Sequence, residues 1–294
     1  MGDSVLVTGG SDRATRWLTG RLDVDGWDVT CVDLSCPDAV DARESVSFRA
    51  ADLTDQSETA ELVRSVDPDA VVHWTALPSP ERHAGMRVFE NEVTSAYNVL
   101  TAAGRHDARI AWASSESAYG LSCAAELTAP EYLPVDEAHP RRPEDPHGTA
   151  KVVGEEIAGM VARRHDVPVA SLRSSWVQYP GDYDCRDVHD ELAAGAGNCW
   201  SYVDVRDLAS AVERSLAADF DGHEPFLVAA ADNYLDRPIE KALLATFDRV
   251  PRDCAVSGDD PALSTAKARS TLDWRPAHSW RDASEETCAT PPTE

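Results

Sequence analysis

Short apolar runs bounded by turn residues alternate with longer amphipathic segments along most of the chain. Such runs are typical of strands buried on both faces of a sheet, whereas apolar residues recurring every three or four positions indicate helices. The predicted strands are Ser4–Thr8, Trp27–Asp33, Val46–Ala50, Ala70–Trp74, Arg109–Ala113, Val167–Leu172 and Pro225–Ala229. The predicted helices lie near Ser11–Leu22, Glu58–Val66, Arg82–Gly104, His147–Arg164, Val205–Leu216 and Ser264–Trp274. This alternation predicts the α/β class, with a doubly wound parallel sheet and helices on both of its faces.

A glycine turn, Gly9-Gly10, joins the first predicted strand to the first predicted helix. At this point of an open parallel sheet, the amides of the helix N-terminus can bind the pyrophosphate of a dinucleotide. Asp33 ends the next strand, where a carboxylate accepts a hydrogen bond from a ribose hydroxyl and repels a 2′-phosphate. No arginine follows until Arg43, so the pattern favours NAD over NADP. The alternative is that Asp33 is an ordinary turn residue at a strand end.

His147 and Lys151 are four residues apart on a predicted helix that opens with Asp145-Pro146. Proline is favoured in the first turn of a helix, and positions i and i+4 lie on the same helix face. An imidazole one turn from an ammonium group is a candidate proton-transfer pair, because the lysine charge shifts the pKa of its neighbour. The competing interpretation is a surface histidine beside a solvated lysine.

The chain is strongly acidic, since 52 Asp and Glu residues against 27 Lys and Arg residues give a formal net charge of −25. This balance excludes a nucleic-acid-binding protein, which needs a basic surface. Because 43% of the 294 residues are hydrophobic, we expect a globular protein rather than a disordered acidic chain. Only Lys151, Lys241 and Lys267 are lysines, and such acidity suggests a halophilic protein whose self-repulsion is screened in molar salt.

The seven cysteines are scattered, and no pair has metal-ligand spacing, so we expect reduced thiols and no metal site. The chain enters its first strand pattern without a basic and apolar leader. No stretch has the roughly 18 apolar residues that a membrane span needs. The sequence therefore predicts a cytoplasmic protein without a membrane partner.

Seven blocks of the sequence carry family-like motifs in a consistent order. They are Val5–Gly10 (TGGxGxxG), Ala51–Leu53 (the adenine-binding DL), Val71–Ala76 (VVHLAA), Asn91 (a helix Asn), Ala113–Gly120 (ASSxxVYG), Pro146–Lys151 (PYGxSK) and Trp200–Ala209 (RDFVHVDDLA). Together they resemble the extended short-chain dehydrogenase/reductase family, the NAD-dependent epimerase/dehydratase group, over nearly the whole chain.

This resemblance implies a Rossmann-type fold with NAD as the cofactor. The cofactor contacts that it implies come from Gly9, Gly10, Asp33, Asp52, Leu53, Trp74, Thr75, Ala76, Asn91 and Lys151. The catalytic residues that it implies are Ser115, His147 and Lys151. In the family a tyrosine at the place of His147 passes a proton to or from the substrate hydroxyl, and the serine helps to hold that hydroxyl.

One departure from the family lies in the glycine loop, where Asp12 and Thr15 replace the second and third glycines. A carboxylate and a Cβ then stand where the backbone should approach phosphate. Like charges about 5 Å apart repel by roughly 3 kcal/mol at an effective dielectric of 20, although molar salt, Arg13 or Arg16 offset part of this cost. The alternative is a loop that binds nucleotide weakly or not at all.

A second departure is His147 itself, at the position of the catalytic tyrosine. A neutral imidazole, whose reference pKa is about 6.5, accepts a proton without first being ionised by Lys151. Because an imidazole is shorter than a phenol, Ser115 or a bridging water would complete the proton relay. The alternative is a fold retained for binding only.

A third departure concerns the substrate. Trp176 and Trp200 fall where nucleotide-sugar epimerases of the family use Asn and Arg to bind a diphosphate, which favours a smaller ligand stacked on aromatic rings. The alternative for each tryptophan is core packing. We expect a cofactor domain of residues 1–174 with 199–230 and a small C-terminal substrate lobe of residues 175–198 with 231–294, on which Ser264–Trp274 is a terminal helix.

The sequence thus predicts an NAD-dependent oxidoreductase or epimerase that acts on a sugar or sugar acid by hydride transfer at a carbinol carbon. The rival hypothesis is a non-catalytic or weakly active NAD(P)-binding homologue with a binding or regulatory role. A small sugar or sugar acid is the expected partner, and a homodimer is a possible assembly.

Overall fold

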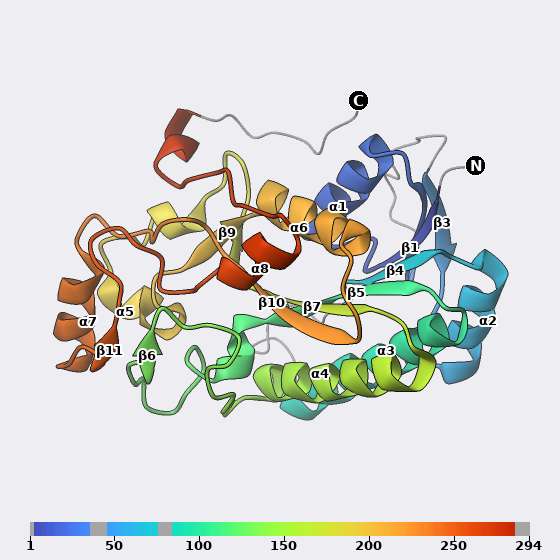
Figure 1. The fold of residues 1–294 in the computed structure, drawn as a ribbon, viewed down its shortest axis with the longest axis horizontal. Helices are drawn as coiled ribbons and strands as arrows, with labels where there is room; N and C mark the ends of the chain where they lie inside the picture. Colours follow the sequence, from blue (N-terminus) through green and yellow to red (C-terminus); the bar gives the residue numbers. More distant parts are fainter. Residues whose placement is uncertain (1–2, 36–45, 76–83, 286–294) are drawn as a thin grey trace.

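The computed structural model describes residues 3–35, 46–75 and 84–285. Its centre is a seven-stranded sheet whose strand pairs are all parallel, in the order β10-β7-β5-β4-β1-β2-β3 (Figure 1). The strands are β1 Ser4–Thr8, β2 Asp28–Asp33, β3 Val46–Ala50, β4 Ala70–His73, β5 Arg109–Ser115, β7 Val169–Ser174 and β10 His223–Val228. The winding reverses between β1 and β4, and a crevice at such a point is the usual ligand site of an open parallel sheet.

Long helices cover both faces of this sheet. They are α1 Arg13–Val24, α2 Gln56–Val66, α3 Gly85–Arg105, α4 Pro146–His165 and α6 Val205–Ala217. Helices α1 and α6 pack on one face, and α2, α3 and α4 pack on the other (Figure 1). The predicted doubly wound parallel sheet is confirmed.

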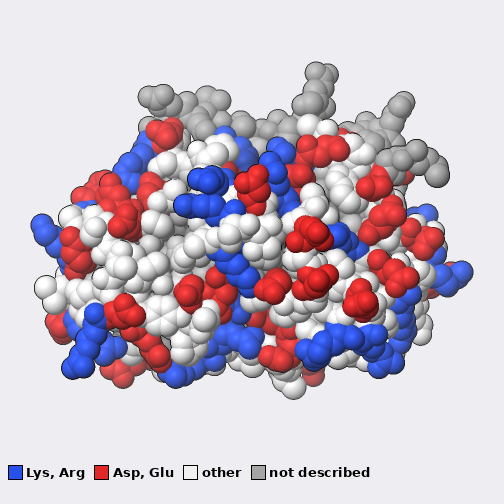
Figure 2. Space-filling view, viewed as in Figure 1, with Lys and Arg blue, Asp and Glu red and all other residues white. Residues whose placement is uncertain are grey.

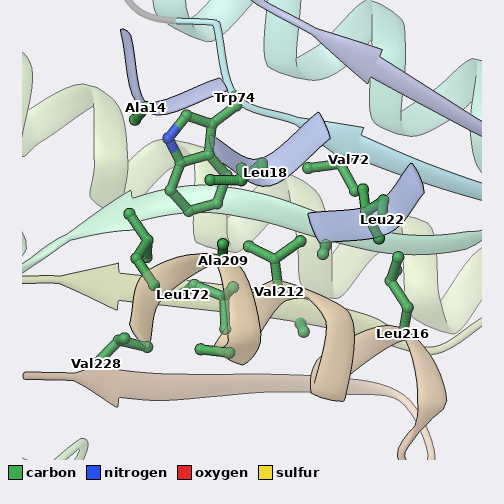
Figure 3. Close-up of a cluster of buried hydrophobic side chains, with 14 of the residues drawn as sticks. Ala14, Leu18, Leu22, Val72, Trp74, Leu172, Ala209, Val212, Leu216 and Val228 are labelled. Atoms are coloured by element: carbon green, nitrogen blue, oxygen red, sulfur yellow. The ribbon is translucent and has the colours of Figure 1, made fainter. Parts of the chain in front are cut away.

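Two core layers form because successive side chains of a strand point to opposite faces. Val5 and Val7 of β1 belong to the layer with α1 and α6, whereas Leu6 belongs to the layer with α2, α3 and α4. Figure 3 shows the first layer, with Trp74 near Leu18 of α1. The buried strands therefore read as continuous apolar runs in the sequence.

Helix beginnings follow from capping side chains. Asp12 Oδ1 accepts a hydrogen bond from the Ala14 amide at 2.8 Å, so α1 begins at Arg13 rather than near Ser11. Asp145 Oδ1 accepts from the Gly148 amide at 2.9 Å, and Pro146 is the first residue of α4, as the sequence predicts.

Shorter elements gather at one end of the molecule, at the left of Figure 1. Strand β8 (Trp176–Gln178) pairs in parallel with β9 (Tyr202–Asp204), and β6 (Tyr132–Leu133) pairs with β11 (Asp253–Cys254). The helices here are α5 Leu192–Gly195 and α7 Ile239–Phe247. A separate hydrophobic cluster holds these elements together. The exact division of the chain into two domains stays a prediction.

The predicted terminal helix at Ser264–Trp274 is shorter and lies elsewhere. Helix α8 covers only Ala266–Thr271, and Ala268, Leu272 and Trp274 pack in the same cluster as α1 and α6. The indole N–H of Trp274 donates to the carbonyl oxygen of Asp207 in α6 at 3.0 Å. The expectation that this helix lies on the small lobe is therefore corrected, because its apolar residues are buried against the sheet domain.

Acidic and basic side chains are interspersed over the face in Figure 2. Many arginines lie within ion-pair distance of a carboxylate; Arg281, for example, pairs with Asp232 at 2.7 Å. Among the described residues, no helix is long and apolar enough to cross a membrane.

Candidate active site

A cavity of about 550 Å³ opens at the carboxyl ends of β1, β2 and β4. The predicted cofactor residues in its lining are Gly9, Asp33, Asp52, Leu53, Trp74, Thr75 and Asn91. Gly10 is not in the lining; a Cβ at this position would approach the ring of Phe48 to 3.0 Å and Cys31 to 3.4 Å. Ala76 lies outside the described residues. The structure thus brings most of the predicted set to one place.

The glycine turn needs glycine at its first position. Gly9 has φ +80°, and a Cβ there would approach the carbonyl oxygen of Trp74 to 3.0 Å. The amides of Gly9 and Gly10 both donate to the carbonyl oxygen of Val32, at 2.8 and 3.0 Å. These two amides are therefore used to fasten the turn to the end of β2 and are not directed at the cavity.

Asp33 is bound to the same turn. Its Oδ2 accepts hydrogen bonds from the Ser11 amide, at 2.9 Å, and from the Ser11 hydroxyl, while Oδ1 accepts from the Leu34 amide at 2.7 Å. An ionised carboxylate has about four acceptor positions, so capacity remains for a ligand hydroxyl. The contacts hold the carboxylate in place at the rim of the cavity.

Asp12 occupies the N-terminus of α1, where a bound anion would otherwise meet free amides. The lining also contains the side chains of Arg13 and Arg87, which bring two positive charges to a cavity with three aspartates. Arg13 pairs with Asp182, and its guanidinium stacks on the ring of Tyr179 at 3.8 Å. The cavity therefore combines an intrinsic anion at the helix end with cations that suit a diphosphate. Arg16, the other offsetting residue suggested by the sequence, is not in this lining.

Two connections shape the far side of the cavity. Asp52 Oδ1 accepts from the amide and hydroxyl of Thr54, and these hydrogen bonds lower the pKa of Asp52. Asn98 of α3 donates to the carbonyl oxygen of Leu53 at 3.0 Å. Asn98 was not predicted from the sequence; as an amide on the buried face of a helix, it needed a partner, which was the available signal.

His73, the last residue of β4, is buried beside the cavity. Thr8 Oγ1 lies 2.9 Å from His73 Nδ1, and it also accepts from the Trp74 amide and the Thr75 hydroxyl. Burial, with the positive charge of Lys151 acting in the same direction, lowers the pKa of His73 to about 3. His73 is therefore neutral and holds the strand end in shape, which positions Trp74 and Thr75.

A second cleft, of about 410 Å³, has Ser115, His147 and Trp176 in its lining. Ser115 is the last residue of β5 and caps the following 3₁₀ turn, Glu116–Tyr119, by accepting from the Ser117 amide at 3.1 Å. Its hydroxyl donates to the Ser117 hydroxyl at 3.1 Å. The predicted serine and histidine thus share one cleft, although they are far apart in sequence.

A buried carboxylate connects His147 to Lys151. His147 Nδ1 lies 2.7 Å from Glu92 Oε1, and Lys151 Nζ lies 3.3 Å from Glu92 Oε2. Lys151 Nζ also donates to the carbonyl oxygen of Ala113 in β5 at 2.9 Å. The side chains of Glu92 and Lys151 are only 3% and 5% exposed, so this is a desolvated ion pair. The alternative of a surface histidine beside a solvated lysine does not describe this arrangement.

Glu92 is ionised in this arrangement. Burial acts to raise its pKa, but the charge of Lys151 and the hydrogen bond from His147 outweigh burial, and the net pKa of Glu92 is lowered. Sequence reasoning missed Glu92 and singled out Asn91 instead. The signal was present, because Glu92 follows Val88 by four residues and precedes Ala96 by four on the apolar stripe of α3.

The two candidate substrate tryptophans have different surroundings. Trp176 is half-buried, lines the cleft and contacts Tyr234 edge to face at 5.8 Å. Trp200 has no exposed surface, and its indole N–H donates to the carbonyl oxygen of Leu192 at 3.1 Å. Trp200 is part of the core, the alternative interpretation, because a fully enclosed ring cannot stack on a ligand.

Within the described ranges, one group of side chains has metal-ligand spacing: His189, Asp190 and Asp236. It borders a different cavity from the two described above, and both carboxylates are exposed, at 73% and 60%. Exposed acidic groups of this kind are common without a metal, so the group adds nothing to the site chemistry.

Residues 5–229 match the model of the NAD dependent epimerase/dehydratase family. The chain therefore belongs to this family, and the predicted membership is confirmed. The cofactor prediction is confirmed with it, since the members of the family are NAD-dependent.

Curated relatives include both dehydrogenases and epimerases. The L-arabinose 1-dehydrogenase (NAD(P)(+)) of Haloferax volcanii is 31% identical over 179 residues, which cover 59% of this chain and 66% of that protein. The uronate dehydrogenase of Pseudomonas putida is 26% identical over 274 residues, covering 88% and 92%. The chain spans 55% and 66% of the length of the first two curated relatives that it matches.

Solved structures show the same fold. A uronate dehydrogenase variant aligns with a TM-score of 0.70 at 20% identity, covering 100% of this chain and 90% of that one. The UDP-glucose 4-epimerase of Thermotoga maritima aligns with a TM-score of 0.71 at 19% identity, covering 95% and 96%. At these identities the likeness concerns the fold alone.

Proposed function

We propose that this protein is an NAD-dependent oxidoreductase or epimerase that acts on a sugar or sugar acid at a carbinol carbon. The observation that carries the proposal is the hydrogen bond between His147 Nδ1 and Glu92 Oε1 at 2.7 Å, in a cleft that also contains Ser115. If the chain had lost the family tyrosine together with its catalytic role, no buried carboxylate would be needed to orient the histidine at that position. The Glu92–His147 contact therefore favours retained catalysis.

The first cavity would hold the cofactor. Asp33 would accept from a ribose hydroxyl, and Asp52 and Leu53, which line the same cavity, would contact the base. Arg13 and Arg87 would face the diphosphate and offset Asp12. When bound, NAD supplies the hydride acceptor. Lys151 donates to Ala113 and pairs with Glu92, so one of its three donors remains for a cofactor hydroxyl.

The residues of the cleft then perform the proton transfer. Because Glu92 is ionised and can only accept, His147 donates to it from Nδ1, and in the neutral imidazole Nε2 is then an acceptor. During oxidation Nε2 takes the hydroxyl proton of the carbinol as the hydride leaves its carbon. Ser115 would hold the same hydroxyl. The buried carboxylate stabilises the imidazolium that results, as in other histidine–carboxylate pairs.

A non-catalytic homologue is the second candidate, and the glycine turn favours it. The amides of Gly9 and Gly10 are bound to Val32, and Asp12 caps α1, so the phosphate side of the cavity is less open than the family motif implies. In this alternative, Glu92 and Lys151 form a structural ion pair only.

Cofactor titration in molar KCl followed by NADH fluorescence is the first test, with NADP as the competitor. We expect NAD to bind more tightly than NADP, because Asp33 would repel a 2′-phosphate. A panel of sugars and sugar acids is then tested for NADH formation. NAD binding without turnover of any substrate would support the second candidate, the non-catalytic homologue. Equal or tighter binding of NADP would contradict the proposed role of Asp33 in selecting NAD.

A further inference from the structure

Ser117 lies beside Ser115 in the lining of the cleft, and the function proposed above gives it no role. Ser115 Oγ donates to Ser117 Oγ at 3.1 Å, and Ser122 Oγ donates to the same oxygen at 3.5 Å. A serine hydroxyl has one donor and two acceptor positions, so both acceptor positions of Ser117 are filled. Of the residues that the structure describes, none accepts the hydroxyl proton of Ser117. Ser117 therefore offers the cleft one unused donor.

Close backbone packing fixes the position of this hydroxyl relative to His147. A Cβ added at Gly148, the residue after His147, would lie 2.5 Å from the carbonyl oxygen of Ser117. The 3₁₀ turn that contains Ser117 therefore rests directly on the first turn of α4. Gly197, which also lines the cleft, approaches Ser122 as closely, since a Cβ there would lie 2.7 Å from the Ser122 Cα. The serine hydroxyls are thus carried by a backbone that is preformed for binding.

The Ser115 and Ser117 hydroxyls together match two neighbouring hydroxyl groups of a sugar. Their oxygens are 3.1 Å apart, and two gauche hydroxyl oxygens on adjacent ring carbons are separated by roughly 3 Å. When Ser115 turns its proton from Ser117 to a ligand oxygen, Ser117 gains a free acceptor position beside its unused donor. A ligand hydroxyl satisfies both positions, because it donates and accepts. A C–H group in the same place satisfies neither.

We infer that Ser117 is a further substrate-binding residue, which contacts the hydroxyl group on the carbon next to the carbinol held by Ser115. The site then requires a vicinal diol, formed by the carbinol that is oxidised and a hydroxyl on the adjacent carbon. This inference rests on the proposed function, because Ser115 and His147 define which hydroxyl reacts.

The neighbouring serine makes this contact stronger than one with an isolated hydroxyl. Ser122 still donates to Ser117 after Ser115 has turned to the ligand. A hydroxyl oxygen that accepts a hydrogen bond polarises its own O–H group, so Ser117 becomes a better donor to the ligand. The competing role for Ser117 is to orient Ser115 alone. In that case its removal would weaken the contact with the carbinol and leave the adjacent hydroxyl unaffected.

The test removes hydroxyl groups from both the protein and the ligand. The probes are galactose and five derivatives that each lack one of its hydroxyl groups: 1,5-anhydrogalactitol and the 2-, 3-, 4- and 6-deoxy sugars. Binding to the NADH-loaded protein in molar KCl is followed by calorimetry and saturation-transfer NMR. The affinity lost with each derivative is compared among the parent, Ser115→Ala and Ser117→Ala. A derivative that lacks the partner of the deleted serine shows no further loss in that variant.

Ser117→Ala should weaken the binding of galactose by about three- to tenfold, the factor for one hydrogen bond. One derivative should bind equally to the parent and to Ser117→Ala. Its missing hydroxyl should be on the carbon next to the one identified with Ser115→Ala. Ser270→Ala is the matched control, since Ser270 is exposed and lies outside the lining of this cleft. Ser117→Thr retains the hydroxyl and should behave as the parent does with that derivative.

Three outcomes overturn the inference. The first is that no derivative depends on Ser117, and the second is that galactose does not bind to a protein that binds NADH. The third is that Ser117 and Ser115 depend on the same hydroxyl, or on hydroxyls of carbons that are not adjacent, which would leave Ser117 an orienting role at most. A melting curve of each variant excludes unfolding as the cause. Dependence on adjacent hydroxyls without turnover would uphold the inference and contradict the proposed catalytic function instead.

Discussion

His147 Nδ1 lies 2.7 Å from the buried Oε1 of Glu92, so a histidine at the position of the family tyrosine is held by a carboxylate from another helix. The same carboxylate pairs with Lys151 at 3.3 Å. One buried anion thus orients the proposed base and neutralises the adjacent cation. The three side chains therefore form one connected group in which each has a partner, and this group leads to the first two predictions.

Glu92→Gln should reduce kcat by about 10- to 10³-fold, because Gln keeps the size of the side chain but removes the charge that stabilises the imidazolium. The control is Glu90→Gln on the exposed face of the same helix. Steady-state kinetics and a melting curve are measured for each variant. A Glu92→Gln protein that remains folded and retains the parent kcat would show that the carboxylate has only a structural role.

His147→Ala should lower kcat by about 10²- to 10⁴-fold with little change in NAD affinity, the range for one lost general base. Lys151→Ala should weaken both activity and NAD affinity, because Lys151 pairs with Glu92 and is the proposed donor to a cofactor hydroxyl. Lys241→Ala, at an exposed site, is its control. His147→Tyr discriminates between the hypotheses. Activity gained by this variant shows a site that still fits the family chemistry, whereas absence of turnover in both parent and variant favours the non-catalytic homologue.

Asp12→Gly should tighten NAD binding, most at low salt, because it removes a negative charge and the cap from the N-terminus of α1. Asp12→Asn separates the two effects, since asparagine retains the cap without the charge. Affinity is measured by NADH fluorescence at several KCl concentrations, and the gap between variant and parent should shrink as salt rises. Unchanged affinity in both variants at every concentration would place the cofactor away from this turn.

The net charge of −25 leads to a salt prediction. The melting temperature should fall sharply when KCl is reduced from molar concentration to about 0.1 M, where the Debye length grows from about 3 Å to about 10 Å and self-repulsion is less screened. A melting temperature that stays constant over this range would contradict the proposed halophilic adaptation. Sucrose at matched osmolality is the control for changes in water activity.

Glu116 predicts a dependence of stability on pH. Burial raises its pKa from 4.5 to about 8, so between these values the folded protein holds a proton that the unfolded chain releases. The contribution of this group to the unfolding free energy therefore decreases as pH rises through this window. Glu116→Gln should melt higher than the parent at pH 8.5, by roughly 2–4 °C for about 1 kcal/mol, with a smaller difference at pH 5. A difference that does not change with pH would show that Glu116 is not protonated in the folded state.

The sequence by itself determined the fold class, the order of the main strands and helices and the family. Apolar runs such as Val71-Val72 and caps such as Asp145 act locally, and local signals survive without tertiary information. Motif order likewise brought Ser115, His147 and Lys151 into one hypothesis, and most of the predicted cofactor residues do line one cavity.

Tertiary structure alone decided which side chains meet across elements. Glu92 and His147 are 55 positions apart, and no periodicity along one helix can show that a carboxylate on α3 faces an imidazole on α4. Burial was decided in the same way: Trp176, the first residue of β8, lines the cleft, whereas Trp200, two residues before β9, is enclosed in the core. The physical reason is that the environment of a side chain depends on the elements packed around it, and these come from distant parts of the chain.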